Sequence, residues 1–139
     1  MRTREFRIRN RLTELDPLAD GLREVCLAAG MDEEGIADVR LLAEEAVSNT
    51  IRHGYADGAD HEILVRTTVD GGAVQVEIED DARAFNPLEA PLPDVELPVE
   101  EKNPGGLGIL LLRSLADRLE YRRSGRKNVL TFARAIRRA

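Results

Sequence analysis

Residues 62–80, EILVRTTVDGGAVQVEIED, carry the pattern that decides the fold. In the second half of this stretch, Val74, Val76 and Ile78 alternate with polar residues, which is the period of a half-buried strand. The Asp-Gly-Gly sequence between the two halves is typical of a hairpin turn. Because the strand has only one apolar face, we expect helices on a single side of the sheet. We therefore predict a two-layer α/β sandwich of the α+β kind, with a mixed, mostly antiparallel sheet.

Working outward from the hairpin, the sequence predicts elements in the order β-α-α-β-β-loop-α-β-β. Asp16-Pro17 is expected to begin the first helix, Asp32 to cap the second, and Gly54 to end it. The expected elements are strand 5–9, helices 16–30 and 32–53, strands 62–69 and 73–80, a helix from Gly108 to about Asp117, and strands 118–124 and 128–135. With no internal repeat and no linker, residues 1–139 are expected to form one domain.

The composition excludes several classes of function. The chain has 139 residues, of which 42% are hydrophobic and 33% charged, as in a soluble globular protein. Its net charge of −6 argues against direct binding of nucleic acid. No apolar run approaches the ~20 residues that span a membrane, and the first ten residues lack the apolar centre of a signal peptide. The single cysteine, Cys26, has no partner for a disulfide, which favours a cytoplasmic protein.

Basic residues gather at the C-terminal end of the chain. Residues 118–139 hold eight Lys or Arg against one acid, whereas residues 1–117 hold twelve against twenty-five. A solvated sheet face accounts for a basic hairpin of this kind. Docking of an acidic partner through electrostatic steering is the alternative.

The segment EEAVSN, at 44–49, lies in the second predicted helix. At about 100° per residue, Glu45 and Asn49 share one shoulder of the buried stripe, and Glu44 lies on the other. The stripe itself consists of Val39, Leu42, Ala43, Ala46 and Thr50. An amide oxygen suits Mg²⁺, and a carboxylate one turn away can orient or deprotonate a hydroxyl. The pair indicates a site for a metal-bound polyphosphate, although a Glu/Asn pair on a solvated helix flank has the same spacing.

Asp80 continues the parity of the apolar residues in its strand, so its carboxylate is expected to face the helices. A carboxylate directed into a core needs a hydrogen-bond donor. A ligand amino group, such as the exocyclic amine of adenine, would provide one. The alternative is that the strand ends at Glu79 and that Asp80 caps a turn.

Two features precede the third predicted helix. Residues 85–104 contain five of the six prolines, in a segment long enough to form a lid or a proline-pinned surface excursion. The sequence PGGLGI at 104–109 follows, and its glycine N–H groups and the helix N-terminus could approach a phosphate. It lacks the Gly-Lys-Ser/Thr of a P-loop, and a flexible connection is the alternative.

In their order and spacing, the motifs EEAVSN-x₃-HGY, IEDDARAFNPL, GGLGI and NVLTF closely resemble those of the anti-sigma-factor serine/threonine kinases. These kinases belong to the GHKL superfamily of ATPases, together with gyrase, Hsp90, histidine kinases and MutL. The resemblance extends over roughly residues 5–135. It implies the Bergerat fold, in which ATP lies between the helices and the sheet under a mobile lid.

The resemblance also implies roles for single residues. Glu45 matches the catalytic base, Asn49 the magnesium ligand, and Asp80 the aspartate that hydrogen-bonds the adenine amine. The HGY sequence at 53–55 matches a recurrent element, in which we interpret His53 as a helix end rather than a catalytic group.

Further positions are implied to contact the nucleotide. Gly106 and Gly108 match the box that closes over the phosphates, residues 85–105 match the ATP lid, and Thr131 matches a last-strand threonine that helps to hold adenine. The complete implied nucleotide-binding set is Asn49, Asp80, Ala82, Phe85, Lys102, Gly105, Gly106, Leu107, Gly108 and Thr131.

The sequence departs from the family pattern at two places. Ala82 and Ala84 stand where many members have glycine, and Pro104 stands where the kinases commonly have an arginine that reaches the terminal phosphates. Lys102 is the candidate substitute for that arginine. Nucleotide binding is therefore better supported by the sequence than phosphoryl transfer.

The resemblance implies an ATP-binding and magnesium-dependent regulatory kinase that phosphorylates a small antagonist protein of the anti-anti-sigma type. A sigma factor and a second copy of the chain are further expected partners, and nucleic acid and membranes are not. The alternative is a nucleotide-gated protein-binding module with little or no kinase activity. The ATP-binding half of a sensor histidine kinase is disfavoured, because neither histidine lies on a long dimerising helix.

Overall fold

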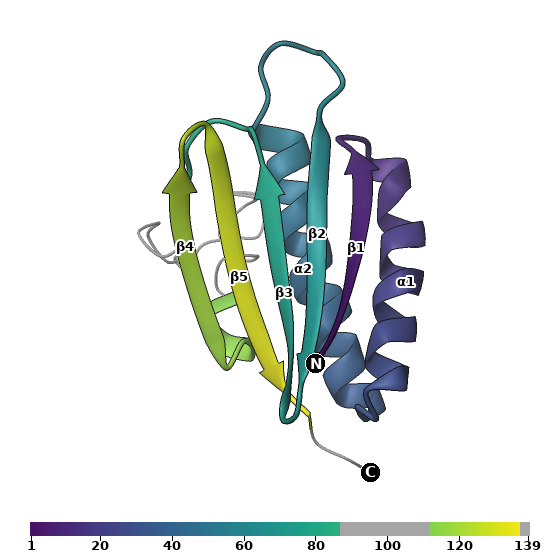
Figure 1. Ribbon diagram of the computed structural model, residues 1–139. Helices are drawn as coiled ribbons and strands as arrows, with labels where there is room; N and C mark the ends of the chain where they lie inside the picture. The colour runs from purple at the N-terminus through teal and green to yellow at the C-terminus, as the bar shows by residue number, and fades with distance from the viewer. Residues whose placement is uncertain (87–111, 137–139) are drawn as a thin grey trace, which may run out of the picture.

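The computed structural model describes residues 1–86 and 112–136, and it arranges them in two layers (Figure 1). In chain order the elements are β1 (Arg2–Arg9), the 3₁₀ turn η1 (Leu12–Glu14), α1 (Leu15–Ala28), α2 (Glu33–His53), β2 (Glu62–Asp70), β3 (Ala73–Asp80), β4 (Arg118–Ser124) and β5 (Lys127–Ala135). The strand order is β1-β2-β3-β5-β4, and all pairings among these strands are antiparallel. The predicted two-layer α+β sandwich is confirmed, with an antiparallel rather than a mixed sheet over the described residues.

The deciding hairpin forms as the alternation predicts. Val74, Val76 and Ile78 are at most 1% exposed and face the helices, whereas the residues between them lie on the outer face of the sheet. The turn is built on Gly71, whose φ of +50° is a conformation that glycine adopts without strain. The pairing of β2 with β3 therefore follows from side-chain pattern and turn chemistry together.

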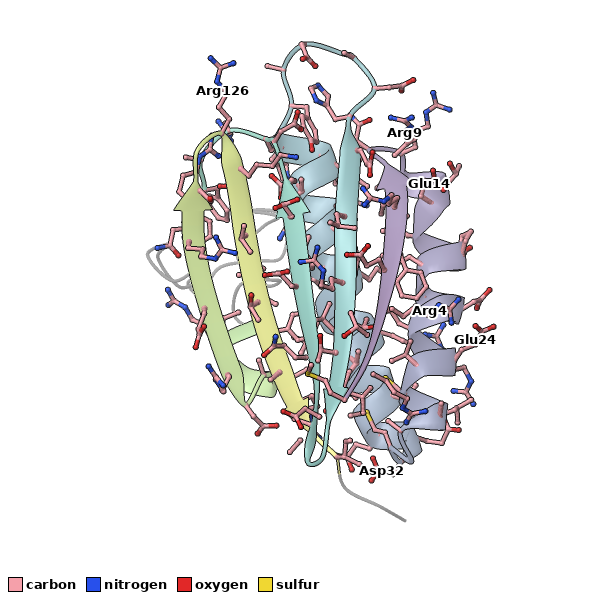
Figure 2. The ribbon with its side chains drawn as sticks, viewed as in Figure 1. Arg4, Arg9, Glu14, Glu24, Asp32 and Arg126 are labelled. Carbon is pink, nitrogen blue, oxygen red and sulfur yellow. The ribbon has the colours of Figure 1, made fainter. Side chains whose placement is uncertain are left out.

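Strand β1 begins three residues earlier than predicted. It pairs with β2 along its whole length, from Arg2 opposite Val69 to Arg9 opposite Glu62. Charged residues can extend a strand at this edge because their side chains reach other elements. Arg4, for example, forms a 2.8 Å ion pair with Glu24 of α1 (Figure 2).

The first helix begins differently from the prediction, since Asp16 is not its N-cap. The chain enters α1 from the 3₁₀ turn, and the residue before the helix, Glu14, already has right-handed helical angles. Its carboxylate accepts a hydrogen bond from the Arg9 backbone N–H at 3.1 Å rather than from the helix (Figure 2). Asp16 lies in the first turn of α1, where its negative charge interacts favourably with the helix dipole and stabilises the helix.

Helix α2 has the predicted bounds. Asp32 caps it by accepting a hydrogen bond from the Gly35 N–H at 2.9 Å, and the helix ends at His53. Gly54 follows with φ −86°, so it does not serve as a left-handed terminator. Instead, a Cβ at residue 54 would lie 2.6 Å from the Thr50 carbonyl oxygen and 2.7 Å from the Ala82 Cβ. Close packing against the turn after β3 therefore explains the glycine.

The core lies between the helices and the inner face of the sheet. Its largest fully buried side chains are Phe132, Leu22, Ile36, Leu42, Ile63, Ile78 and Leu112. Residues 112–115 are helical, as predicted, and the predicted start of that helix at Gly108 lies outside the described residues. Among the described residues, no helix is long and apolar enough to cross a membrane.

Candidate functional site

The shoulder of α2 carries the predicted carboxylate and amide. Glu45 and Asn49 are half-buried one turn apart, and Glu44 is exposed, as the helical spacing requires. The residues between them in the chain include Ala46 and Val47, which are buried. The structure therefore brings Glu45 and Asn49 together at the margin of the helix–sheet interface.

Asp80, the last residue of β3, lies on the inner face of the sheet and is 5% exposed. Its Oδ1 accepts hydrogen bonds from the Asn128 side-chain amide at 2.9 Å and from the Ala82 backbone N–H at 3.0 Å. Burial raises the pKa of Asp80 above its usual value, and these hydrogen bonds oppose that shift. Asp80 is thus a buried carboxylate whose first oxygen is fully used by the protein.

The second oxygen of Asp80 points toward α2. Among the described residues it lies near the Thr50 hydroxyl, at 3.4 Å, and that same hydroxyl lies 3.2 Å from the Ala46 carbonyl oxygen. A hydroxyl has a single proton to donate, so it cannot satisfy both acceptors at once. Oδ2 therefore keeps the capacity to accept a hydrogen bond from a ligand.

Asn128, in β5, is a site residue that the sequence did not reveal. It is 6% exposed and lies directly opposite Asp80 in the β3–β5 register. In the sequence, Asn128 shares its parity with the buried Leu130 and Phe132, which was the available signal. The shared parity indicates that Asn128 lies beside Asp80 only when the pairing of β5 with β3 is known.

Thr131, by contrast, does not lie on the face of the sheet that carries Asp80 and Asn128. It pairs with Glu77 of β3 and Glu120 of β4, so it lies on the outer face of the sheet, opposite to the helices. Side chains of neighbouring residues along a strand alternate between faces, and Thr131 is three residues from Asn128. The described structure therefore separates Thr131 from Asp80.

The turn after β3 accommodates the two alanines that replace the usual glycines. No non-glycine residue in the described ranges has a positive φ, so neither Ala82 nor Ala84 needs glycine for its backbone. Ala82 is 4% exposed, and its methyl lies against Gly54 at the end of α2. Its N–H and C=O both take part in the hydrogen bonds around Asp80.

The remaining predicted positions lie at or beyond the edge of the described chain. Phe85 is 47% exposed, and its N–H donates to the Asn128 Oδ1 at 3.4 Å. Lys102, Pro104 and residues 105–108 lie outside the described residues, as does the predicted lid from residue 87 onward.

The loop that follows α2 forms a compact polar cluster beside Asp80. The ring of Tyr55 stacks on that of His61 with centroids 4.3 Å apart, and its buried hydroxyl has no hydrogen-bond partner within the described residues. The two ring nitrogens of His61 lie 2.9 Å from Asp57 Oδ2 and 3.1 Å from Asp81 Oδ2. Hydrogen bonds to these carboxylates raise the pKa of His61, and burial raises that of Tyr55. His53, by contrast, is an exposed helix end.

The basic C-terminal hairpin covers the far edge of the sheet. Arg126 projects from the tip of the β4–β5 turn (Figure 2). Arg122 forms a 3.7 Å ion pair with Glu77, and Lys127 lies 4.0 Å from Glu79. Part of the basic charge is therefore matched by acids of β3.

An antiparallel sheet covered on one face by helices, with a buried aspartate directed toward the helix that carries Glu45 and Asn49, is typical of the histidine kinase-like α+β sandwich. The chain belongs to the family described as Histidine kinase-like ATPase domain, whose pattern matches residues 8–134. The resemblance noted in the sequence is thereby confirmed at the level of the family.

The named relatives include protein kinases and an anti-sigma factor. The chain is 30% identical over 92 residues to Serine/threonine-protein kinase BtrW of Bordetella bronchiseptica, covering 66% of this chain and 65% of that protein. It is 28% identical over 100 residues to Serine-protein kinase RsbW of Listeria monocytogenes, covering 69% and 64%. It is 26% identical over 97 residues to Anti-sigma F factor of Thermoanaerobacter pseudethanolicus, covering 70% and 67%. The chain thus spans just under two thirds of the first two relatives.

Solved structures share the fold. The RsbU and RsbW domains of Rv1364c from Mycobacterium tuberculosis match with a TM-score of 0.71 and 19% identity, over 100% of this chain and 34% of that one. A histidine kinase domain from Erythrobacter litoralis matches with a TM-score of 0.57 and 19% identity, over 90% and 60%.

Proposed function

We propose that the chain binds Mg·ATP between α2 and the inner face of the sheet, and that it is a regulatory serine/threonine protein kinase of the anti-sigma-factor type. The observation that carries the proposal is the Asp80 carboxylate, buried on the inner face with Oδ2 directed toward α2. An acceptor in that position suits the exocyclic amine of adenine. Asn49 and Glu45 lie on the same helix, at the margin where the phosphates would extend.

The donor set fits a magnesium ion held together with a triphosphate. Mg²⁺ usually keeps several waters and takes one or two protein oxygens in addition to phosphate oxygens. Asn49 would supply such an oxygen, and among the described residues no cluster of three His, Cys, Asp or Glu side chains offers an alternative. When bound, the ion would neutralise charge on the β- and γ-phosphates.

The transfer step would rest on Glu45. Its carboxylate would accept the proton of a serine or threonine hydroxyl as that oxygen bonds to the γ-phosphorus. The bond from the γ-phosphorus to the bridging oxygen would break, leaving ADP and a phosphorylated acceptor. Because phosphoryl transfer needs mainly positioning and charge stabilisation, a half-buried position one turn from Asn49 is suited to this role.

The expected acceptor is a small antagonist protein, and a sigma factor is the expected regulated partner. This part of the proposal is supported by the names of the relatives, which include serine-protein kinases and an anti-sigma F factor. Such partners would be cytoplasmic. A homodimer is also expected by the resemblance.

Transfer of label from γ-labelled ATP to the co-encoded antagonist protein tests the proposal. The wild-type protein should label a serine or threonine of the antagonist, and Asn49→Ala should lose most of this activity together with its magnesium-dependent nucleotide affinity. Asn10→Ala, immediately after β1, is the control, because the Asn10 side chain contacts Ala59 and His61. No transfer, together with an Asn49→Ala variant that binds nucleotide normally, would overturn the proposal.

The nucleotide-gated binding module is the second candidate, and Pro104 in place of an arginine is the observation that favours it. The same experiment separates the two functions. Tight binding of Mg·ATP without labelling of any co-encoded partner would favour the module. Efficient labelling would exclude it.

A further inference from the structure

Both halves of the Asn128 side-chain amide form hydrogen bonds beside Asp80. Asn128 lies in β5 directly opposite Asp80 and is 6% exposed. Its Nδ2 donates to Asp80 Oδ1 at 2.9 Å, to the Arg83 carbonyl oxygen at 3.0 Å and to the Ala82 carbonyl oxygen at 3.3 Å. One amide group thus holds both the aspartate and the turn that follows it.

The other half of the same amide is held by donors only. Asn128 Oδ1 accepts from the Tyr121 hydroxyl at 2.5 Å, from Arg123 Nη1 at 3.1 Å and from the Phe85 N–H at 3.4 Å. Since every neighbour of Oδ1 is a donor and every neighbour of Nδ2 is an acceptor, the amide has one consistent orientation. Asn128 must therefore present its N–H to Asp80.

This orientation makes the two oxygens of Asp80 unequal. Oδ1 is occupied by Asn128 and by the Ala82 N–H, whereas within residues 1–86 and 112–136 the contact of Oδ2 is with a Thr50 hydroxyl shared with Ala46. The unequal use leaves one acceptor position, directed toward α2. A 6-amino purine offers a donor to that position, and a 6-oxo purine offers a second acceptor that would face a carboxylate.

We propose that Asn128 is the positioning residue for base selection, because its amide fixes Asp80 as a hydrogen-bond acceptor and leaves Oδ2 free for the amino group of adenine. The inference rests on the proposed nucleotide function and deepens it. Asn128 also links this choice to strand β4, through Tyr121 and Arg123. Base selection then depends on an edge strand of the sheet as well as on the aspartate.

The test compares the affinities for ATP and for inosine triphosphate, which replaces the 6-amino group by an oxygen and keeps the sugar and phosphates. Asn128→Asp keeps the shape of the side chain and its acceptor oxygen but replaces the amide donor by a second carboxyl group, so Asp80 loses its fixed N–H donor and the two carboxyls compete for a proton. The preference for ATP over inosine triphosphate should fall by about tenfold or more, since a single well-placed hydrogen-bond donor or acceptor discriminates by that order. A loss of packing alone would weaken both nucleotides equally.

Asn10→Asp is the matched control. Asn10 is also an asparagine whose amide joins two segments, donating to the Ala59 carbonyl oxygen at 3.1 Å and accepting from the His61 N–H at 2.9 Å. The same substitution there removes a donor without touching Asp80, so the nucleotide preference should stay at the wild-type value. A folded Asn128→Asp variant with the wild-type preference would overturn the inference.

Tyr121→Phe keeps the inference testable if Asn128→Asp does not fold. It removes one donor to Asn128 Oδ1 and should lower the preference by about two- to fivefold, in line with one weakened hydrogen bond; an unchanged preference would contradict the inference. Asp80→Asn separates this inference from the proposed function. If Asp80→Asn loses base preference and the Asn128 and Tyr121 variants do not, only the role of Asn128 fails. If Asp80→Asn binds both nucleotides as the wild type does, the proposed base site itself fails.

Discussion

Glu45 and Glu44 are neighbours in the chain with opposite positions on α2. Glu45 is half-buried beside Asn49, and Glu44 is exposed. Glu45→Gln should therefore lower the rate of phosphoryl transfer by 10²–10⁴-fold, about the range for a general base, while leaving nucleotide affinity nearly unchanged. Steady-state kinetics with the antagonist protein measures this difference.

Glu44→Gln is the control for that experiment, since it makes the same chemical change one residue away. It should leave both the rate constant and the Michaelis constant at wild-type values. Equal losses in the two variants would show that charge on α2, rather than a base at Glu45, supports the reaction.

Gly54 has a steric rather than a conformational role. A methyl group there would meet the Thr50 carbonyl oxygen at 2.6 Å and the Ala82 Cβ at 2.7 Å. Overpacking of this kind costs about 1–3 kcal/mol, which exceeds the gain of up to about 1 kcal/mol in helix propensity. Gly54→Ala should therefore lower the free energy of unfolding, measured by urea denaturation.

Gly72→Ala provides the comparison, because its added Cβ has no atom of the described residues within 4 Å apart from its neighbours in the chain. It should change the free energy of unfolding by less than about 0.5 kcal/mol. A Gly54→Ala variant as stable as Gly72→Ala would contradict the close packing of α2 on the turn at Ala82.

The sequence predicts the position of a residue when that position depends on periodicity within one element, and not when it depends on pairing between distant strands. Glu45, Asn49 and the facing of Asp80 follow from periodicity within one element, and the structure has them where periodicity expects. The sequence could not predict whether Asn128 or Thr131 lies beside Asp80, because that depends on how β5 pairs with β3. A resemblance placed Thr131 beside the base, and strand register puts it on the other face.

At the scale of elements, the loop between α2 and β2 is held by a histidine between two carboxylates. Hydrogen bonds with Asp57 and Asp81 raise the pKa of His61 above the ordinary histidine value of about 6.5. The folded state thus binds the proton more tightly than the unfolded chain. The contribution of protonated His61 to stability is fully present below about pH 6.5, the pKa in the unfolded chain. It is lost as the pH rises through the higher pKa that His61 has in the folded state.

The prediction is that the stability difference between the wild type and His61→Gln is largest near pH 6 and shrinks toward pH 9. Urea denaturation at several pH values measures it. His53→Gln, at the exposed end of α2, should give a small difference with little dependence on pH. A difference for His61→Gln that grows with rising pH would contradict the ion-pair account.

The helix layer is joined to the sheet by an ion pair at their interface. Arg134 of β5 is 6% exposed, and its Nη2 lies 3.1 Å from Asp38 Oδ2 of α2. Asp38→Asn keeps the shape and removes the charge, so it should lower the free energy of unfolding by about 1.5–3 kcal/mol. Glu120→Gln, which breaks an exposed pair with Arg118, should cost less than about 1 kcal/mol. Equal effects in thermal denaturation would show that burial of the Arg134 pair has no consequence.

At the scale of the whole molecule, the layer architecture could be predicted because every strand and helix carries its own periodicity. The alternation at 73–80 and the helical stripe of α2 require one shared interface, and that is enough to define a two-layer sandwich. The strand order β1-β2-β3-β5-β4 could not be predicted in this way, since it depends on contacts between distant segments. The same long-range pairing brings Asn128 to Asp80, so the missed residue and the missed strand order have one cause.

The account as a whole depends on a nucleotide site between the two layers with Asp80 at its base. Adjacent residues of β3 provide a matched pair, because Asp80 faces the helices and Glu79 faces outward. Asp80→Asn and Glu79→Gln each convert one carboxylate to an amide with no change of shape. The two substitutions make the same chemical change on opposite faces of the sheet.

The most direct test is the titration of the wild type and these two variants with Mg·ATP by isothermal calorimetry. We predict that Asp80→Asn weakens binding by about tenfold or more, the loss expected for a charged hydrogen bond in a buried site, and that Glu79→Gln binds as the wild type does. Undiminished binding by Asp80→Asn would contradict the central claim.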